Sequence, residues 1–109
     1  MNTITGYIYK IEYNEDKEIR YIGSTMRSLK SRMNQHKKHY KEWLNNRMKG
    51  KCMIYLNFKK YGMKNFTMSL IKSYEVVDQR HLLAYEQLWM NKLSNINKNR
   101  AFVSTPDFK

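Results

Sequence analysis

Two segments near the start of the chain combine aromatic and β-branched residues with the period of a strand. Alternate positions of residues 6–13 place four large side chains on one face: Tyr7, Tyr9, Ile11 and Tyr13. The polar stretch 14–17 separates this segment from residues 19–22, which have the same character. This order predicts an antiparallel hairpin in which Tyr21 lies near Tyr9 across the strand pair.

Gly23 follows the second predicted strand and is expected to end it, because glycine permits a positive φ or the close approach of another group. A long helical pattern begins at Ser28, a residue type that caps helices, and runs to about Met48. Its apolar arc comprises Leu29, Met33, Tyr40, Leu44 and Met48. His36 falls inside this arc, and Arg32 lies along one edge of it.

The remaining segments predict two further helices with a strand between them. Residues 54–61 have helical spacing and precede Gly62, which suits the left-handed position after a helix end. Residues 66–71 have the composition of a strand, and Asp78 can cap a helix over about 79–93. The order of two strands, two helices, a strand and a helix indicates an α/β or α+β domain around a small sheet.

The chain of 109 residues is long enough for one domain with a modest core. We assign residues 1–100 to this domain and expect 101–109 to form a loosely ordered tail. Cys52 is the single cysteine, which excludes an internal disulfide and fits a reducing compartment. We see neither a signal peptide nor an apolar run of the ~20 residues that span a bilayer. We therefore expect a soluble, intracellular protein outside the membrane.

Basic residues outnumber acidic residues by 21 to 9, and the formal net charge is +12. Residues 24–65 hold 12 of the basic residues and one acid, Glu42, whereas residues 1–23 hold three basic and four acidic residues. A local excess of this size attracts polyanions. Nucleic acid is the first candidate partner and an acidic membrane surface the second, while a lysine-rich surface without a partner is the plain alternative.

Glu86 is an acidic residue within the apolar stripe of the last predicted helix. The stripe comprises Leu82, Leu83, Trp89, Met90 and Leu93. At roughly 100° per residue, Glu86 lies in the middle of this stripe. An ionised carboxylate there is costly unless it is paired or bound to a metal. Its position therefore indicates either a buried ion pair with an arginine or lysine, or a polar cleft.

Arg32 and His36 are four residues apart and therefore project from one side of the long predicted helix. A guanidinium in that position could grip a phosphate, and an imidazole could transfer a proton. The alternative is that Arg32 belongs to the solvated basic face and that His36 packs in the core. His39 lies near the same edge, and periodicity does not exclude it as a rival to His36.

Tyr9 and Tyr21 could belong to the same site, although tyrosines in strands most often serve packing. Hydrolysis of a phosphodiester needs a group that orients or deprotonates water, a cation for the transition-state charge and often a metal. The two tyrosines together with Arg32, His36 and Glu86 can supply this set.

Short motifs follow one another along the chain: Tyr7-Ile8-Tyr9, Tyr21-Ile22-Gly23-Ser24-Thr25, Arg32 with His36, and Glu86 with Trp89. Their order and the short gap between the two tyrosine motifs resemble the GIY-YIG nuclease domain over roughly residues 6–100. The chain is most similar to free-standing members from large DNA viruses and phages and to the catalytic domains of homing endonucleases. Tyr7 stands where the family has glycine, although Gly6 precedes it. The resemblance favours His36 over His39, because the family's histidine follows its arginine by one helical turn.

The resemblance implies a GIY-YIG fold, with a small three-stranded, mainly antiparallel sheet flanked by helices. The cleft would lie on the face shared by Tyr9, Tyr21, Arg32 and Glu86. It also implies an endonuclease that hydrolyses DNA with a divalent ion, Mg²⁺ or Mn²⁺, held by Glu86. Such a hard ion keeps most of its waters, so one carboxylate and phosphate oxygens suffice.

The same resemblance assigns a role to each remaining site residue. Tyr9 would position the attacking water or act as its general base, which requires nearby positive charge because a free tyrosine has a pKa of about 10. Tyr21 would orient water and phosphate, and Arg32 would stabilise the charge that builds on the phosphate oxygens. His36 would hydrogen-bond the tyrosine or relay its proton. Asn97 is our choice for the family's late asparagine, and its rivals are Asn95 and Asn99.

Basic side chains around the site are expected to contact backbone phosphates: Arg27, Lys30, Lys37, Lys38 and Lys41. Nothing in the sequence looks like a module that reads bases. We therefore expect weak sequence preference or recognition of DNA shape, on duplex or branched DNA, unless a partner protein or homodimer supplies specificity. The alternative function is a catalytically silent nucleic-acid-binding domain on the same scaffold.

Overall fold

The computed structural model describes residues 2–45 and 53–97. Within these residues the chain forms strands β1 (Ile4–Tyr13) and β2 (Asp16–Thr25), helices α1 (Leu29–Leu44) and α2 (Met53–Tyr61), the short 3₁₀ helix η1 (Met63–Asn65), strand β3 (Phe66–Val76) and helix α3 (Gln79–Lys92). The α+β order of the predicted elements is therefore confirmed. None of the helices in the described part of the chain has the length and apolar character needed to cross a bilayer.

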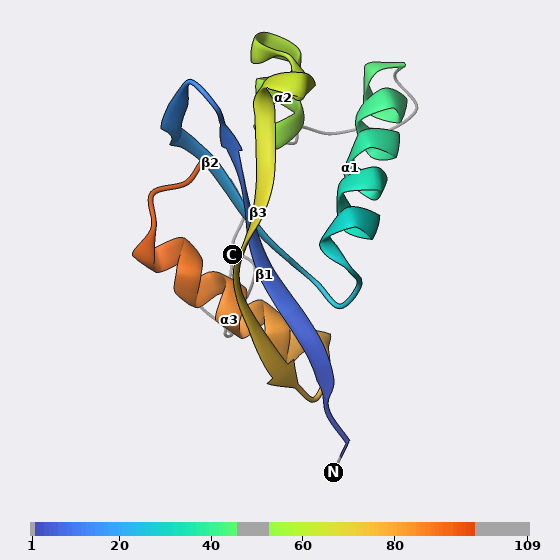
Figure 1. Ribbon diagram of the computed structural model, residues 1–109, viewed down its shortest axis with the longest axis vertical. Coiled ribbons are helices and arrows are strands. Elements are labelled where there is room, and N and C mark those ends of the chain that lie inside the picture. Colours follow the sequence, from blue (N-terminus) through green and yellow to red (C-terminus); the bar gives the residue numbers. More distant parts are fainter. Residues whose placement is uncertain (1, 46–52, 98–109) are drawn as a thin grey trace, which may run out of the picture.

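The three strands form one antiparallel sheet in the order β2-β1-β3, with β1 in the centre (Figure 1). Tyr9 lies opposite Gly23 in the β1–β2 pair and opposite Leu70 in the β1–β3 pair. Tyr21 lies directly opposite Ile11. The two tyrosines of the hairpin are therefore diagonal neighbours, a relation that still allows long side chains to interact.

The helices cover both faces of the sheet, with α1 and α2 on one face and α3 on the other (Figure 1). The core on the α1–α2 side is built from Tyr9, Ile11, Ile54, Tyr55, Phe58 and Phe66. The smaller core on the α3 side is built from Ile8, Ile22, Val76 and Leu82. Because Ile8 and Tyr9 are consecutive in a strand, they point to opposite faces and bury β1 on both sides.

The strands extend further than the sequence pattern predicts. β2 continues through Gly23 to Thr25, so the prediction that Gly23 ends the strand is wrong. β3 continues to Val76 because its pairing with β1 runs on beyond the apolar segment 66–71. The physical reason is that backbone hydrogen bonds to a central strand do not require apolar side chains at every position.

The predicted helix caps are present. The Ser28 hydroxyl accepts a hydrogen bond from a first-turn N–H of α1 at 3.1 Å, and the Asp78 carboxylate does the same for α3 at 2.9 Å. Gly62 follows α2 with a positive φ of 89°, which favours glycine at this position, although its ψ of 122° differs from that of a left-handed helical residue. α1 ends at Leu44, earlier than the predicted end near Met48, a residue that lies outside the described residues.

The segment after α3 runs along the outer edge of β2. The backbone N–H of Ile96 donates to the carbonyl oxygen of Arg20 at 2.7 Å. The Asn97 side chain donates to the Ile22 carbonyl oxygen at 2.7 Å and accepts from the Ile22 N–H at 3.0 Å. These bonds pair backbone groups of β2 that an edge strand would otherwise present to water. The predicted tail, 101–109, lies outside the described residues.

Candidate active site

Tyr9 is the centre of a buried hydrogen-bonded cluster between β1 and α1. Its hydroxyl shares a hydrogen bond of 2.9 Å with Nε2 of His36, and Nε of Arg32 donates to the same oxygen at 3.2 Å. Tyr9 is 0% exposed and His36 is 2% exposed. Both α1 side chains reach one oxygen because they lie one helical turn apart on the face that covers the sheet.

Gly23 makes room for the Tyr9 ring. A Cβ atom added at Gly23 would lie 2.4 Å from both Cζ and the hydroxyl oxygen of Tyr9. Gly23 has no positive φ, so its requirement comes from close approach and not from backbone conformation. The glycine of the second motif therefore positions the tyrosine of the first.

Burial controls the protonation of this cluster. It raises the pKa of Tyr9 to about 12, although the charge and hydrogen bond of Arg32 oppose the rise. Burial also lowers the pKa of His36 to about 3, and the positive charge of Arg32 lowers it further. At neutral pH the pair is a neutral phenol and a neutral imidazole. Arg32 alone therefore does not provide the lowered tyrosine pKa that a general base requires.

The second nitrogen of His36 indicates which atom carries the proton. Nδ1 is buried and has no hydrogen-bond partner within residues 2–45 and 53–97. A buried N–H without an acceptor is rarer in proteins than an unused acceptor, which favours a proton on Nε2. In that tautomer Nε2 of His36 donates to Tyr9. The Tyr9 oxygen then accepts two hydrogen bonds and is left with its own proton to donate.

Glu86 reaches the site from α3, on the opposite face of the sheet from α1. It is 9% exposed, and the Ser24 hydroxyl donates to its Oε1 at 2.5 Å. Burial raises the pKa of Glu86, while the Ser24 hydrogen bond and the Arg32 charge oppose the rise. Among the described residues Glu86 forms no ion pair with a lysine or arginine within 4.0 Å, so the buried ion pair considered from the sequence is absent there.

The side chains around Glu86 suit an ion such as Mg²⁺, which takes most of its ligands from water and substrate, better than a metal whose ligands all come from the protein. The described residues contain no group of three or more His, Cys, Asp or Glu side chains that could hold a metal. Mg²⁺ is commonly bound by one or two carboxylates, with waters and substrate phosphates as its other ligands. Because burial raises the pKa of Glu86, a proton competes with a cation for this carboxylate, and a bound cation would offset the cost of the buried negative charge.

A cavity of about 320 Å³ opens where β2, α1 and α3 meet. Its lining residues are Ser24, Thr25, Met26, Arg27, Arg32, Gln35 and Gln79. The lining includes two guanidinium groups and no acid, so it suits an anion such as a phosphate. Arg32 lies between this cavity and Tyr9, because it lines the cavity and also donates to the Tyr9 oxygen. The predicted site residues thus come from both faces of the sheet near the end of β2, and not from one shared face as the resemblance implied.

The other predicted site residues occupy different places. Tyr21 is half-buried, and its ring stands edge-on to His36 with ring centroids 6.0 Å apart. Asn97 binds the backbone of β2 and does not line the cavity. Asn95 donates to two carbonyl oxygens at the end of α3, and Asn99 lies outside the described residues.

The predicted phosphate-binding side chains are all exposed on α1 or just before it: Arg27, Lys30, Lys37, Lys38 and Lys41. Arg27 lines the cavity described above. Lys30 and Lys37 line a separate hollow between α1 and β3. Lys38 and Lys41 line neither of these two hollows.

Three residues at the site have no role predicted from the sequence. Ser24 directly follows the second tyrosine motif and binds Glu86. Gln35 accepts a hydrogen bond of 2.6 Å from the guanidinium of Arg32, and Gln79 lines the cavity from the first turn of α3. The spacing of three between Arg32 and Gln35 was a usable signal, because residues three apart on a helix are neighbours. No local signal connects Gln79 to this site.

Comparison with known proteins gives one family and two viral relatives. The family model of the GIY-YIG catalytic domain matches residues 5–100. The "Putative MSV199 domain-containing protein 146R" of Invertebrate iridescent virus 6 is 34% identical over 92 residues, which cover 84% of this chain and 35% of that protein. The "Uncharacterized protein 019R" of the same virus is 31% identical over 104 residues, which cover 92% of this chain and 35% of that protein. The chain thus spans about a third of the length of these curated relatives, and no solved structure matches it.

Proposed function

Because this chain belongs to the GIY-YIG catalytic domain family, a family of nucleases, we propose that it is a divalent-metal-dependent DNA endonuclease. One observation supports this proposal most strongly. Arg32 connects the buried Tyr9 hydroxyl to a cavity without acids, and Ser24, the partner of Glu86, lines the same cavity. The tyrosine and the carboxylate named from the sequence are thus each one hydrogen bond away from a residue that lines this cavity.

The cavity would receive the phosphate whose bond is cleaved. Arg32 and Arg27 supply positive charge there, and a guanidinium can bind two phosphate oxygens at once. Arg32 would also stabilise the negative charge that develops on the non-bridging oxygens during attack. Gln35 holds the guanidinium in place through its side-chain oxygen, which limits the cost of orienting it.

Tyr9 and His36 would control the attacking water. A phosphate in the cavity competes with Tyr9 for Arg32, and its binding would leave the Tyr9 oxygen with His36 as its fixed partner. The Tyr9 hydroxyl would then hold the water for attack on phosphorus, and His36 would keep the phenol in place by donating from Nε2 to its oxygen. The proton of the attacking water would pass to solvent or to a phosphate oxygen. Tyr21, edge-on to His36, would keep the imidazole in place. Displacement of the 3′ oxygen leaves 5′-phosphate and 3′-hydroxyl ends.

Glu86 would hold the Mg²⁺ or Mn²⁺ ion, with Ser24 orienting its carboxylate. When bound, the ion would supply positive charge to phosphate oxygens and to the leaving group. Glu86 must be ionised for this role, and burial raises its pKa and so disfavours the ionised form. The Ser24 hydroxyl and the Arg32 charge counteract that effect.

The exposed basic residues of α1 would hold duplex or branched DNA over the cavity. Contacts from lysine to phosphate give affinity without reading bases, so sequence preference would be weak. Recognition of a specific DNA sequence would therefore require a partner protein or a second copy of the chain.

Nicking of a supercoiled plasmid tests the proposal. Wild-type protein should convert the plasmid to nicked and linear forms with Mg²⁺ or Mn²⁺ and should lose this activity in EDTA. Glu86→Gln keeps the acceptor for Ser24 but removes the charge, and it should not cut in any metal. Equal cutting by wild type and Glu86→Gln, purified in the same way, would contradict the role of Glu86 in the reaction.

A catalytically silent DNA-binding domain is the second candidate. The observation that favours it is the complete burial of Tyr9, whose pKa lies far above neutral. This reading predicts that wild type retards DNA in low salt, yet cuts neither duplex nor branched DNA with any divalent ion. Cutting that depends on both metal and Glu86 would exclude it.

A further inference from the structure

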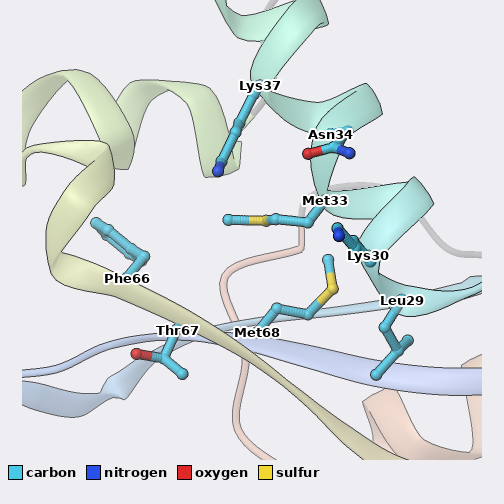
Figure 2. A pocket seen from close by; sticks show the side chains of 8 residues that line it. All are labelled: Leu29, Lys30, Met33, Asn34, Lys37, Phe66, Thr67 and Met68. Atoms are coloured by element: carbon cyan, nitrogen blue, oxygen red, sulfur yellow. The ribbon is translucent and has the colours of Figure 1, made fainter.

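A groove of about 410 Å³ lies between α1 and β3, on the side of α1 away from the candidate active site. It is lined by Leu29, Lys30, Met33, Asn34, Lys37, Phe66, Thr67 and Met68. Figure 2 shows Met33 and Met68 extending from α1 and β3 into the space between these two elements, with Phe66 beside them. The volume lies in the ~300–1,000 Å³ range of ligand pockets.

The walls of this groove combine apolar and cationic groups. Met33, Met68 and Leu29 are half-buried, so they still present apolar surface to a ligand. Lys30 and Lys37 are exposed, and no acid is among the lining residues. The groove therefore suits a flat or apolar group that is attached to negative charge.

A nucleotide has this combination of properties. Its base offers an aromatic face, and its phosphates are anionic. Thioethers pack favourably against aromatic rings and adapt to their shape, which describes Met33 and Met68. Asn34 adds an amide that can bond the edge of a base, and the Thr67 hydroxyl, which donates to Oδ1 of Asn14 at 2.6 Å, can still accept a hydrogen bond. Lys30 and Lys37 can contact the phosphates on either side of the base.

Positive charge connects the groove with the cavity at the active site. Arg27 lines the cavity and Lys30 lines the groove, and both stand at the start of α1. A nucleic-acid strand that crosses this end of α1 can therefore contact both hollows. Bases inside a continuous duplex are stacked and paired, so they cannot enter such a groove without being extruded.

We propose that this groove binds an unpaired base of the substrate, so that the protein prefers DNA with an extruded nucleotide, such as a bulge or a flap, over continuous duplex. The inference rests on the proposed nuclease function for the identity of the ligand as DNA. It adds a substrate class and a second binding site, with Met33, Met68 and Phe66 contacting the base and Lys30 and Lys37 contacting the backbone.

The test measures binding in EDTA by fluorescence anisotropy with three labelled DNA probes. One is a continuous duplex, the second carries one unpaired thymine, and the third carries an abasic residue at the same position. The second and third have the same backbone and the same charge, so their difference reports the base alone. Since one stacked base contributes about 1–3 kcal/mol, wild type should bind the thymine bulge at least about 5-fold more tightly than the abasic bulge.

Substitutions in the groove distinguish contacts with the base from contacts with the phosphate backbone. Met68→Gln should reduce the preference for thymine over the abasic site to less than about 2-fold, whereas Met68→Leu should keep most of it. Lys37→Gln should weaken both bulged probes to the same extent. Leu88→Gln, a matched loss of an exposed apolar side chain on α3, should leave the preference unchanged. Circular dichroism of each variant would show whether it is folded.

Equal affinity of wild type for the thymine and abasic bulges would overturn the inference, and so would a full preference in Met68→Gln. Either result would leave the groove to another occupant, such as an apolar side chain of an acidic protein. Plasmid nicking, measured separately, distinguishes this failure from failure of the nuclease proposal. Nicking without a base preference would refute only the proposal that the groove binds a base. A base preference without nicking would refute only the proposal that the protein cleaves DNA.

Discussion

The two sides of α1 carry different chemistry although they belong to one helix. Toward β1 and the end of β2, Arg32 and His36 make directional hydrogen bonds to a fully buried tyrosine. Toward β3, Met33 and Lys37 line a groove with flexible side chains. Arg32 and Met33 are consecutive, as are His36 and Lys37, and consecutive residues point about 100° apart on a helix.

Under the proposed function, this difference corresponds to a division of labour between the two sides. Cleavage needs reacting groups held in one geometry, and the hydrogen bonds around Tyr9 provide that geometry. Binding of varied DNA needs an adaptable surface, and thioethers and lysines provide it. Damage to the first side should therefore change the rate of cleavage, whereas damage to the second should change affinity.

The largest effect is expected from Tyr9→Phe. Loss of the hydroxyl removes the group that would hold the attacking water, and such groups contribute about 10²–10⁴-fold to rate. Single-turnover cleavage should fall by about 10³-fold while the DNA dissociation constant changes less than about 2-fold. Tyr13→Phe removes a hydroxyl from the same strand, outside the site, and should cut normally. Near-normal cutting by Tyr9→Phe would remove Tyr9 from the chemistry.

Gly23→Ala should act on the same side of α1 without removing any catalytic group. Its Cβ would collide with the Tyr9 ring at 2.4 Å, so the ring must move. We expect cleavage to fall about 10²-fold and the free energy of unfolding to fall by about 1–3 kcal/mol.

Gly6→Ala is the matched control, because its Cβ meets the flexible end of Leu82 at 2.6 Å on the other face of the sheet. It should lower stability but retain cleavage within a few-fold. Cleavage and urea unfolding are measured for both variants. An equal loss of cleavage in the two would contradict the positioning role of Gly23.

Gln35→Met should have a smaller effect, because it removes the acceptor that holds the Arg32 guanidinium and keeps the side-chain length. We expect single-turnover cleavage to fall by about 10-fold, the loss of roughly one hydrogen bond to a charged group. DNA affinity should remain unchanged, since Gln35 carries no charge. Gln87→Met on α3 serves as control. A drop in DNA affinity with an unchanged cleavage rate would show that Gln35 contributes to DNA binding and not to cleavage.

The smallest effect concerns stability and depends on pH. Burial raises the pKa of Glu86, so the folded protein binds this proton more tightly than the unfolded chain does. The resulting stabilisation is present below the ordinary pKa of 4.5 and is lost as pH rises through the raised pKa. In EDTA, wild type should therefore lose stability relative to Glu86→Gln as the pH rises from 4 to 7.

Urea unfolding at both pH values provides the measurement. Mg²⁺ at pH 7 should stabilise wild type by mass action and leave Glu86→Gln unaffected. Equal stabilisation of both proteins by Mg²⁺ would show that the ion binds elsewhere.

Local sequence patterns were sufficient to predict the helices and strands. They also predicted that two candidate site residues lie on the same side of one helix. The caps at Ser28 and Asp78 follow from residue type, and the shared side of Arg32 and His36 follows from helical spacing. The position of Glu86 in an apolar stripe correctly predicted a buried carboxylate. The ends of the strands were predicted poorly, because pairing with β1 decides them and the sequence of one strand does not contain its partner.

By itself, then, the sequence determined the order of the strands and helices, the basic character of α1 and the burial of Glu86, since each depends on periodicity or charge within a short segment. Only the tertiary structure decided that Gly23 accommodates the Tyr9 ring, that Glu86 reaches the site from the opposite face, and that burial raises the pKa of Tyr9. These properties depend on strand register and on exclusion of water. Both arise only when segments far apart in the chain pack together.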